Sequence, residues 1–308
     1  MSYSPFALLA CLALGGCFSM SAVPPRDDLP SVGAMDMQSS AHVDASRGAE
    51  VASAWAANCV LVRPLLNGKD VGWFILDSGA SGWTIDSRAA ASAGLEQIGR
   101  VTIGGPRVGQ AAAVYTCATV TLGPLVLDGL ELTGLDMHNT AWSFGREVVG
   151  IAGREAFASV AIELDGRSKQ IRMMSEASEI AEAAWHDIEL RNNLPCVRCR
   201  YAKDAEGLFM LDTGCNVAVH VFGRAVTEHD LLADPSRIRG SRTQTNFGSS
   251  EKVSLGSLDH FAVGAEELGP LHEVTFAQPG DAPVGVAARA RGEARRVGGA
   301  ARSDGRGQ

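Results

Sequence analysis

The sequence predicts an all-β protein of two similar lobes, with short helices and a pseudo-twofold axis between the lobes. Three observations predict this fold class. Apolar and polar residues alternate in many short segments, which is the period of β-strands. Helical periodicity is confined to a few short stretches. A pattern also recurs at a spacing of 135 residues, which indicates that one folding unit is present twice.

Size and charge set the first limits on function. The chain has 308 residues, of which 46% are hydrophobic, so it can bury the cores of two modest domains. Its net charge of -8 argues against nucleic acid as the main partner, because phosphate binding needs a basic surface. The sequence also lacks the usual motifs of zinc proteases, serine hydrolases and P-loop enzymes.

The N-terminus has the pattern of an export signal. An apolar run ends in LGGC, which resembles a bacterial lipobox and predicts a signal peptide over residues 1–17 with a lipid on Cys17. We therefore expect an exported lipoprotein that its lipid anchors to a membrane of the bacterial cell envelope. An ordinary secretory signal, giving a periplasmic or secreted protein, and a chain that is not exported remain open. Residues 18–50 lack apolar periodicity and are expected to form a flexible tether.

The repeat defines the predicted domains. The segment GWFILDSG at residues 72–79 corresponds to GLFMLDTG at residues 207–214, and VGIA at residues 149–152 corresponds to VGVA at residues 284–287. The predicted units are a first lobe at residues 51–174, a connector at 175–190, a second lobe at 191–288 and a disordered basic tail at 289–308.

Each unit is predicted to contain the same kinds of element in the same order. The first unit should have strands at 59–65 and 72–76, a helix at 87–93, a hairpin over 101–122, and strands at 125–135, 147–153 and 159–164. The second should have strands at 194–201 and 208–211, a helix near 224–232, a hairpin around 245–255 and strands within 261–276. The Gly-, Ser- and Asn-rich stretches 102–109 and 245–251 suit exposed hairpin tips.

The matching motifs identify a family resemblance. Residues 75–81, 210–214 and 148–154 resemble the pepsin/retropepsin superfamily of aspartic proteases, and more closely its bacterial envelope members with two retropepsin-like units in one chain. The resemblance covers roughly residues 55–290 and implies a two-lobed, acid-protease-like β-barrel fold. It also implies that Asp77 lies opposite Asp212 across the pseudo-twofold axis, with a water molecule between them.

The resemblance assigns supporting roles around this pair of aspartates. Ser78 and Thr213 are expected to form hydrogen bonds across the two loops and to lock the loops together. Gly79 and Gly214 should allow the close backbone approach that two symmetric loops need. In the family, one hairpin closes over the peptide as a flap that excludes water. The tip of the first hairpin, at Gly104 and Gly105, is the candidate for this substrate-binding flap.

Paired carboxyl groups can hydrolyse a peptide without a metal or a cofactor. Two carboxylates about 3 Å apart cannot both ionise cheaply, so they share one proton, as aspartic proteases in general do. The pair can then deprotonate water and protonate the departing amine. We therefore predict an aspartic endopeptidase that acts on a peptide or protein substrate, has no cofactor and no metal, and works as a monomer with an internal dyad.

Several alternatives remain open on the sequence alone. The chain can be a non-catalytic envelope protein that keeps the acid-protease fold for binding or as a scaffold. Each unit can also pair with a partner chain. A single aspartate in either motif can cap a turn or bind a metal. Cys215 can be a packing residue or an oxidisable thiol, and the C-x-x-C at Cys196 and Cys199 is predicted to place ordinary cysteines on a strand.

The second unit differs from the first at its C-terminal end. After VGIA, the first unit continues into an alternating strand. After VGVA, the second unit becomes the Arg- and Gly-rich tail, which has almost no apolar residues. The hypothesis is a C-terminal truncation or a reading-frame shift after about Ala290, which would leave the second lobe without its last strand and its activity in doubt.

Overall fold

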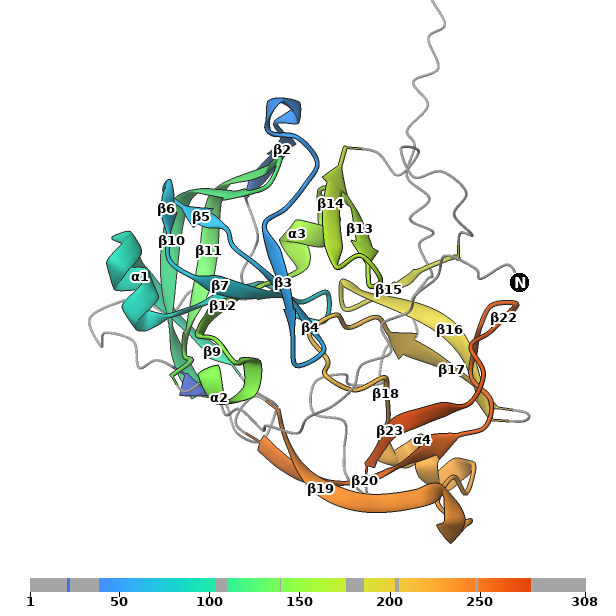
Figure 1. Cartoon of the computed structure of the whole chain (residues 1–308). Helices are drawn as coiled ribbons and strands as arrows, with labels where there is room; N and C mark the ends of the chain where they lie inside the picture. Colours follow the sequence, from blue (N-terminus) through green and yellow to red (C-terminus); the bar gives the residue numbers. More distant parts are fainter. Residues whose placement is uncertain are drawn as a thin grey trace, which may run out of the picture.

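The chain folds into two strand-rich lobes (Figure 1). The computed structural model describes residues 21–22, 39–103, 110–138, 140–175, 186–202, 205–246 and 249–277. We refer to residues 40–174, together with 21–22, as the first lobe and to residues 189–277 as the second lobe. The fold is all-β with short helices, as predicted. Cys17, Gly104, Gly105, the VGVA segment and the basic tail lie outside the described residues.

The elements of the first lobe follow one another with short connections. They are β1 (Ser21–Ala22), β2 (Ser40–Val43), η1 (Ala45–Arg47), β3 (Ser53–Ala56), β4 (Cys59–Val62), β5 (Leu65–Leu66), β6 (Lys69–Asp70), β7 (Trp73–Leu76), β8 (Trp83–Asp86), α1 (Ser87–Ala93), β9 (Glu96–Ile103), β10 (Gln110–Leu122), β11 (Leu125–Asp136), α2 (Ala141–Phe144), β12 (Val148–Ala152), α3 (Arg154–Ala158), β13 (Ala161–Asp165) and β14 (Gln170–Met174).

The second lobe contains fewer elements among its described residues. They are β15 (Glu189–Arg191), β16 (Leu194–Ala202), β17 (Ala205–Met210), β18 (Val219–Val221), α4 (Gly223–Glu228), η3 (Pro235–Arg237), β19 (Ile238–Asn246), β20 (Ser249–Leu258), β21 (Ala262–Val263), β22 (Glu266–Glu267) and β23 (Leu271–Ala277).

One large sheet organises the first lobe. Its twelve strands include the path β3-β4-β7-β12-β8-β11-β10-β5-β6, with β1 and β2 paired to β11 and β9 paired to β10. Strand β12 lies between β7, to which it is parallel, and β8, to which it is antiparallel. The end of β7 is therefore held inside the sheet, and Asp77 follows directly after it.

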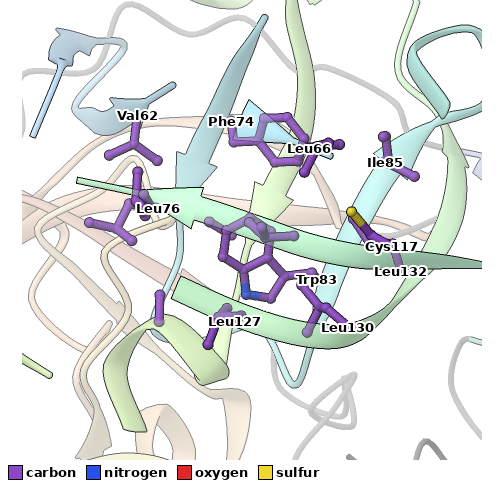
Figure 2. Close-up of a cluster of buried hydrophobic side chains, with 14 of the residues drawn as sticks. Val62, Leu66, Phe74, Leu76, Trp83, Ile85, Cys117, Leu127, Leu130 and Leu132 are labelled. Carbon is purple, nitrogen blue, oxygen red and sulfur yellow. The ribbon is translucent and has the colours of Figure 1, made fainter. Parts of the chain in front are cut away.

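The first-lobe sheet buries apolar side chains on both of its faces, because successive strand residues point to opposite faces. Phe74 and Leu76 belong to the first-lobe core on one face, where Trp83 is also fully buried, with its ring centroid 5.9 Å from that of Phe74 (Figure 2). Ile75 belongs to a cluster on the other face. We call this the Ile75 cluster; its buried members are Cys59, Leu61, Ile75, Leu135, Met137, Phe144, Val148 and Ile151.

The second lobe has a core of its own between two smaller sheets. One sheet has the path β15-β16-β21-β22 with β17 paired to β16, and the other has the order β18-β23-β20-β19. Alternate residues of these strands, such as Val219 and Val221 of β18, fill the core between them. Among the described residues, no strand joins β17 to β18 in the way that β12 joins β7 to β8. The matching VGVA segment lies outside the described range.

Local sequence explains where the short helices begin and end. Helix α1 begins after Asp86, whose side chain accepts a hydrogen bond from the Arg88 amide at 2.9 Å, and it ends at Gly94, whose positive φ of 74° favours glycine. It covers residues 87–93, as predicted. Helix α4 ends at Glu228, earlier than the predicted 232, and Asp230 has a positive φ of 47° that a continuing helix could not contain.

Two predicted boundaries need correction. Residues 40–50 were expected to belong to a flexible tether, but β2 pairs with β11, and Glu50 forms a bridge to Arg172. Strand β2 is largely exposed, so it carries no apolar period that the sequence could reveal. The predicted connector at 175–190 also overlaps β15, whose Leu190 pairs with Pro195. In the described part of the chain, no helix is long and apolar enough to cross a membrane.

Close packing in the first-lobe core gives a test of the sheet arrangement. A Cβ added at Gly150 of β12 would lie within 2.7 Å of three ring atoms of the buried Phe74. We therefore expect Gly150→Ala to lower the free energy of unfolding by about 1–3 kcal/mol, the usual cost of overpacking. Gly240→Ala is the matched control, because nothing lies within 4 Å of that position. Urea unfolding of both variants tests the prediction, and equal stability would contradict it.

Candidate active site

Two aspartates occupy equivalent turns at the ends of β7 and β17. The Asp77 amide donates to the Ala152 carbonyl at 2.9 Å, which ties this turn to β12. Each carboxylate accepts a hydrogen bond from the amide two residues later, Gly79 to Asp77 at 2.8 Å and Gly214 to Asp212 at 2.9 Å. The two turns therefore fix their carboxyl groups in the same local geometry.

The two turns meet face to face. The side chain of Asp212 packs on Gly79, where an added Cβ would lie 2.7 Å from the Asp212 Cγ. Asp77 packs on Gly214 in the same way and even more closely. Only glycine leaves room for this reciprocal contact. The structure thus brings together the two aspartates that the repeat pointed to.

The carboxyl groups behave as a coupled pair. Burial raises the pKa of Asp77 well above its ordinary value, and the negative charge of Asp212 and a hydrogen bond to it raise this pKa further. Burial also raises the pKa of Asp212, although its hydrogen bond with Asp77 acts in the opposite direction. The two carboxyl groups therefore interact directly, and their titration belongs to the pair and not to either residue.

Four hydrogen bonds cross between the turns with the symmetry of the aspartates. The Ser78 amide donates to the Thr213 hydroxyl at 3.0 Å, and the Thr213 amide donates to the Ser78 hydroxyl at 3.1 Å. The hydroxyl of Ser78 donates to the Leu211 carbonyl and that of Thr213 to the Leu76 carbonyl, both at 2.7 Å. Each hydroxyl therefore satisfies one amide and one carbonyl of the opposite turn.

A second contact between the lobes was not predicted from the sequence. In the turn between β3 and β4, the amide of the Asn58 side chain donates to the Asn216 carbonyl at 3.4 Å. The Cys59 thiol lies 3.3 Å from the Gly214 carbonyl oxygen and donates to it. This turn therefore supports the Asp212 loop from the first lobe. An asparagine recurs at positions 58 and 193, and both residues have a positive φ. This recurrence is the sequence signal for such turns.

A buried glutamate beside the first loop was also missed by the sequence analysis. The Arg154 amide donates to the Ala80 carbonyl at 3.1 Å, so the start of α3 contacts the Asp77 loop. The next residue, Glu155, is buried, and both of its carboxylate oxygens lack a hydrogen-bond partner within the described structure. Burial raises the pKa of Glu155 to about 7, against a smaller opposing effect of the Arg154 charge.

The cysteines form no metal site within the described structure, where no group of three potential ligands gathers. Cys196 and Cys199 lie buried on β16 as free thiols, and burial raises the pKa of both. Cys215 is partly exposed beside the Asp212 turn. The arms of the candidate flap hairpin, β9 and β10, pair up to Ile103 and Gln110, while its tip is outside the described residues.

The crossed hydrogen bonds predict a stability effect that depends on one hydroxyl. Thr213→Val removes the hydroxyl and leaves the Ser78 amide and the Leu76 carbonyl without this partner. Thr213→Ser keeps the hydroxyl and serves as the control. We expect the valine variant to lose about 1–3 kcal/mol of unfolding free energy relative to the serine variant. Urea denaturation measures this difference, and equal values would show that the crossed bonds do not hold the turns together.

The raised pKa of Glu155 predicts that the stability difference between the wild type and Glu155→Gln changes with pH. When the pKa of a carboxyl group rises from 4.5 to about 7 on folding, its contribution to the free energy of unfolding is at its full value below pH 4.5. This contribution falls as the pH rises and levels off above about pH 7, with a total change of about 3 kcal/mol. Relative to the wild type, Glu155→Gln should therefore gain about that much stability between pH 4.5 and pH 8. A difference between the two proteins that does not change with pH would contradict the assignment.

One family model matches part of the chain. Residues 62–153, which include β7, Asp77 and β12, match a family model described as "Aspartyl protease". No curated protein matches the chain.

Among solved structures, the chain is similar to a retropepsin-like aspartic protease from Rickettsia conorii, with 14% identity, a TM-score of 0.30, and coverage of 46% of this chain and 96% of that one. It is also similar to Basic 7S globulin from soybean, with 10% identity, a TM-score of 0.39, and coverage of 79% and 87%. The family match confirms the predicted resemblance to the pepsin/retropepsin superfamily of aspartic proteases, over residues 62–153.

Proposed function

We propose that the protein is an aspartic endopeptidase in which Asp77 and Asp212 together activate a water molecule. The observation that carries the proposal is the reciprocal packing of each carboxyl group on the glycine of the opposite turn. This arrangement forces two acidic groups into contact, although a separation would cost less electrostatic energy. A pair that shares one proton in a buried setting is the arrangement that acid–base hydrolysis needs.

The proposed reaction uses the shared proton twice. The ionised carboxyl group of the pair removes a proton from water as the water oxygen attacks the peptide carbonyl carbon. The protonated carboxyl group donates its hydrogen to the carbonyl oxygen, which stabilises the developing charge. The tetrahedral intermediate then breaks its C–N bond as the departing nitrogen takes a proton from the pair. One of the two hydroxyl groups of the intermediate returns its proton to the pair as the carbon becomes the carbonyl carbon of the product acid. The dyad ends with one proton, as it began.

Two features of the dyad support its use on a peptide, and two further proposals concern other parts of the chain. The crossed hydrogen bonds of Ser78 and Thr213 hold the carboxyl groups in place, so little reorganisation accompanies the reaction. Both halves of the dyad come from one chain, so we propose that a monomer suffices. The β9–β10 hairpin is proposed to close over the substrate through its tip at Gly104 and Gly105. Attachment to the bacterial envelope through Cys17 completes the proposal.

Substitution of either aspartate tests this function. Asp77→Asn and Asp212→Asn should each lower the rate of cleavage of a mixed peptide library by a factor of at least about 10²–10⁴, because general acid–base catalysis is lost. Asp259→Asn is the control, since Asp259 pairs with Arg237 at the exposed surface of the second lobe. Mass spectrometry of the library measures cleavage, and a statine-type peptide should inhibit it because it resembles the tetrahedral intermediate.

Two results would contradict the proposal. One is a wild-type protein that cleaves no peptide at any pH at which it remains folded. That result would favour a binding or scaffold role for the fold. The other is cleavage that persists unchanged in both asparagine variants, which would place the chemistry elsewhere in the chain.

A further inference from the structure

A polar cluster lies on the second lobe, on the sheet face opposite its core. Strand register places Arg242 beside Val253, and Val253 beside Ala277. It also places His220 beside Thr275 on the neighbouring strands β18 and β23. Because Val219, Val221, Val274 and Phe276 point into the core, His220 and Thr275 between them point to the other face. We call His220, Phe222, Arg242 and Thr275 the His220 cluster.

The contacts of His220 fix the ring within this cluster. Its Nδ1 lies 2.8 Å from the Thr275 hydroxyl, and Thr275 is fully buried. The ring packs edge-to-face on Phe222 with 4.9 Å between the centroids, and Phe222 is 40% exposed. Burial, and then the positive charge of Arg242, lower the pKa of His220. The cluster thus joins an exposed aromatic ring to a partly buried imidazole that is neutral near pH 7.

Arg242 supplies a cation that the described structure leaves without an acidic partner. The Nε of its guanidinium is buried and has no hydrogen-bond partner there, and Arg242 forms no ion pair with a described carboxylate. A buried guanidinium donor without an acceptor is costly. The neighbouring Val253 and Ala277 offer it no polar atom from their side chains. A carboxylate from outside the protein would satisfy the guanidinium in its preferred geometry.

The cluster lies on the face that corresponds to the dyad side of the first lobe. In that lobe, the face opposite the core carries the Ile75 cluster, against which Ala80 of the Asp77 loop packs. Strand β8 follows the Asp77 loop and leads into α1, and β18 follows the Asp212 loop and leads into α4 in the same way. His220 lies on the corresponding face of β18, a short distance along the chain from Asp212.

The two sides of the dyad therefore differ in chemistry. On β8 the residue that points away from the core between Trp83 and Ile85 is Thr84, a small and buried hydroxyl. On β18 the corresponding position holds His220, with Arg242 and Phe222 near it. A peptide that lies across the dyad would meet a small neutral site on the first lobe and a cationic, aromatic site on the second.

We propose that the His220 cluster is a specificity subsite that takes an acidic side chain of the peptide on one side of the bond to be cleaved. The inference rests on the proposed function of the dyad. In this subsite Arg242 pairs with the substrate carboxylate. His220 and Thr275 form the polar wall of the subsite, and Phe222 packs on the aliphatic stem of the substrate side chain. The substrate class is a peptide with Glu or Asp at that position.

Two matched peptide libraries test the subsite. One contains Glu and Asp, and in the other each Glu is replaced by Gln and each Asp by Asn. The wild type should cleave the best acidic sites at least about tenfold faster than their amide counterparts, since a hydrogen bond to a charged group is stronger than one to a neutral amide. Arg242→Met should reduce this ratio to about one. Arg224→Met, at an exposed arginine that pairs with Glu228 in the same lobe, should leave the ratio unchanged.

A binding measurement separates failure of the subsite from failure of the proposed function. Fluorescence anisotropy gives the dissociation constants of the fluorescently labelled acidic and amide libraries for Asp77→Asn protein, with and without Arg242→Met. An acidic preference that Arg242→Met abolishes supports the subsite, even where the wild type cleaves nothing and the peptidase proposal fails. Equal binding of the two libraries, no binding of either, or a preference that survives Arg242→Met overturns it. Cleavage without an acidic preference overturns the subsite alone.

Discussion

The structure depends on the exchange of hydrogen bonds between the two aspartate turns. The hydroxyl groups of Ser78 and Thr213 each bond to one amide and one carbonyl of the opposite turn. Neither lobe could satisfy these backbone groups alone. Gly79 and Gly214 make this exchange possible, because any larger residue would collide with the opposing carboxyl group. Once the turns are joined, Asp77 and Asp212 have no arrangement except contact.

The sheets supply the rigidity that this contact needs. Strand β12 lies between β7 and β8 and holds the start of the Asp77 turn through the Ala152 carbonyl. Apolar side chains are buried on both faces of the first-lobe sheet, in the lobe core on one face and in the Ile75 cluster on the other. The turn of Asn58 and Cys59 lies on the second of these faces and contacts the Asp212 loop. Packing in one lobe is thus coupled to the geometry of both carboxyl groups.

Sequence reasoning succeeded where a local pattern had a single physical meaning. The apolar runs before Asp77 and Asp212 end in small residues, and the spacing of 135 residues made the two turns equivalent. Helix α1 was predictable because Asp86 and Gly94 mark its ends. Strand β2 was not predictable, because its exposed residues show no alternation. The burial of Glu155 depends on how helix α3 packs beside the Asp77 loop, and the meeting of His220 with Arg242 depends on strand register. A single sequence reveals neither of these.

The central claim is that Asp77 and Asp212 hold one proton between them, and carboxyl ¹³C NMR titration of labelled aspartates tests it most directly. The account predicts that the two carboxyl groups titrate together in two separated steps, with one pKa well above the ordinary range of aspartate. In Asp77→Asn, the remaining Asp212 signal should titrate in a single step. Two independent titrations at ordinary pKa values, unchanged in that variant, would contradict the claim.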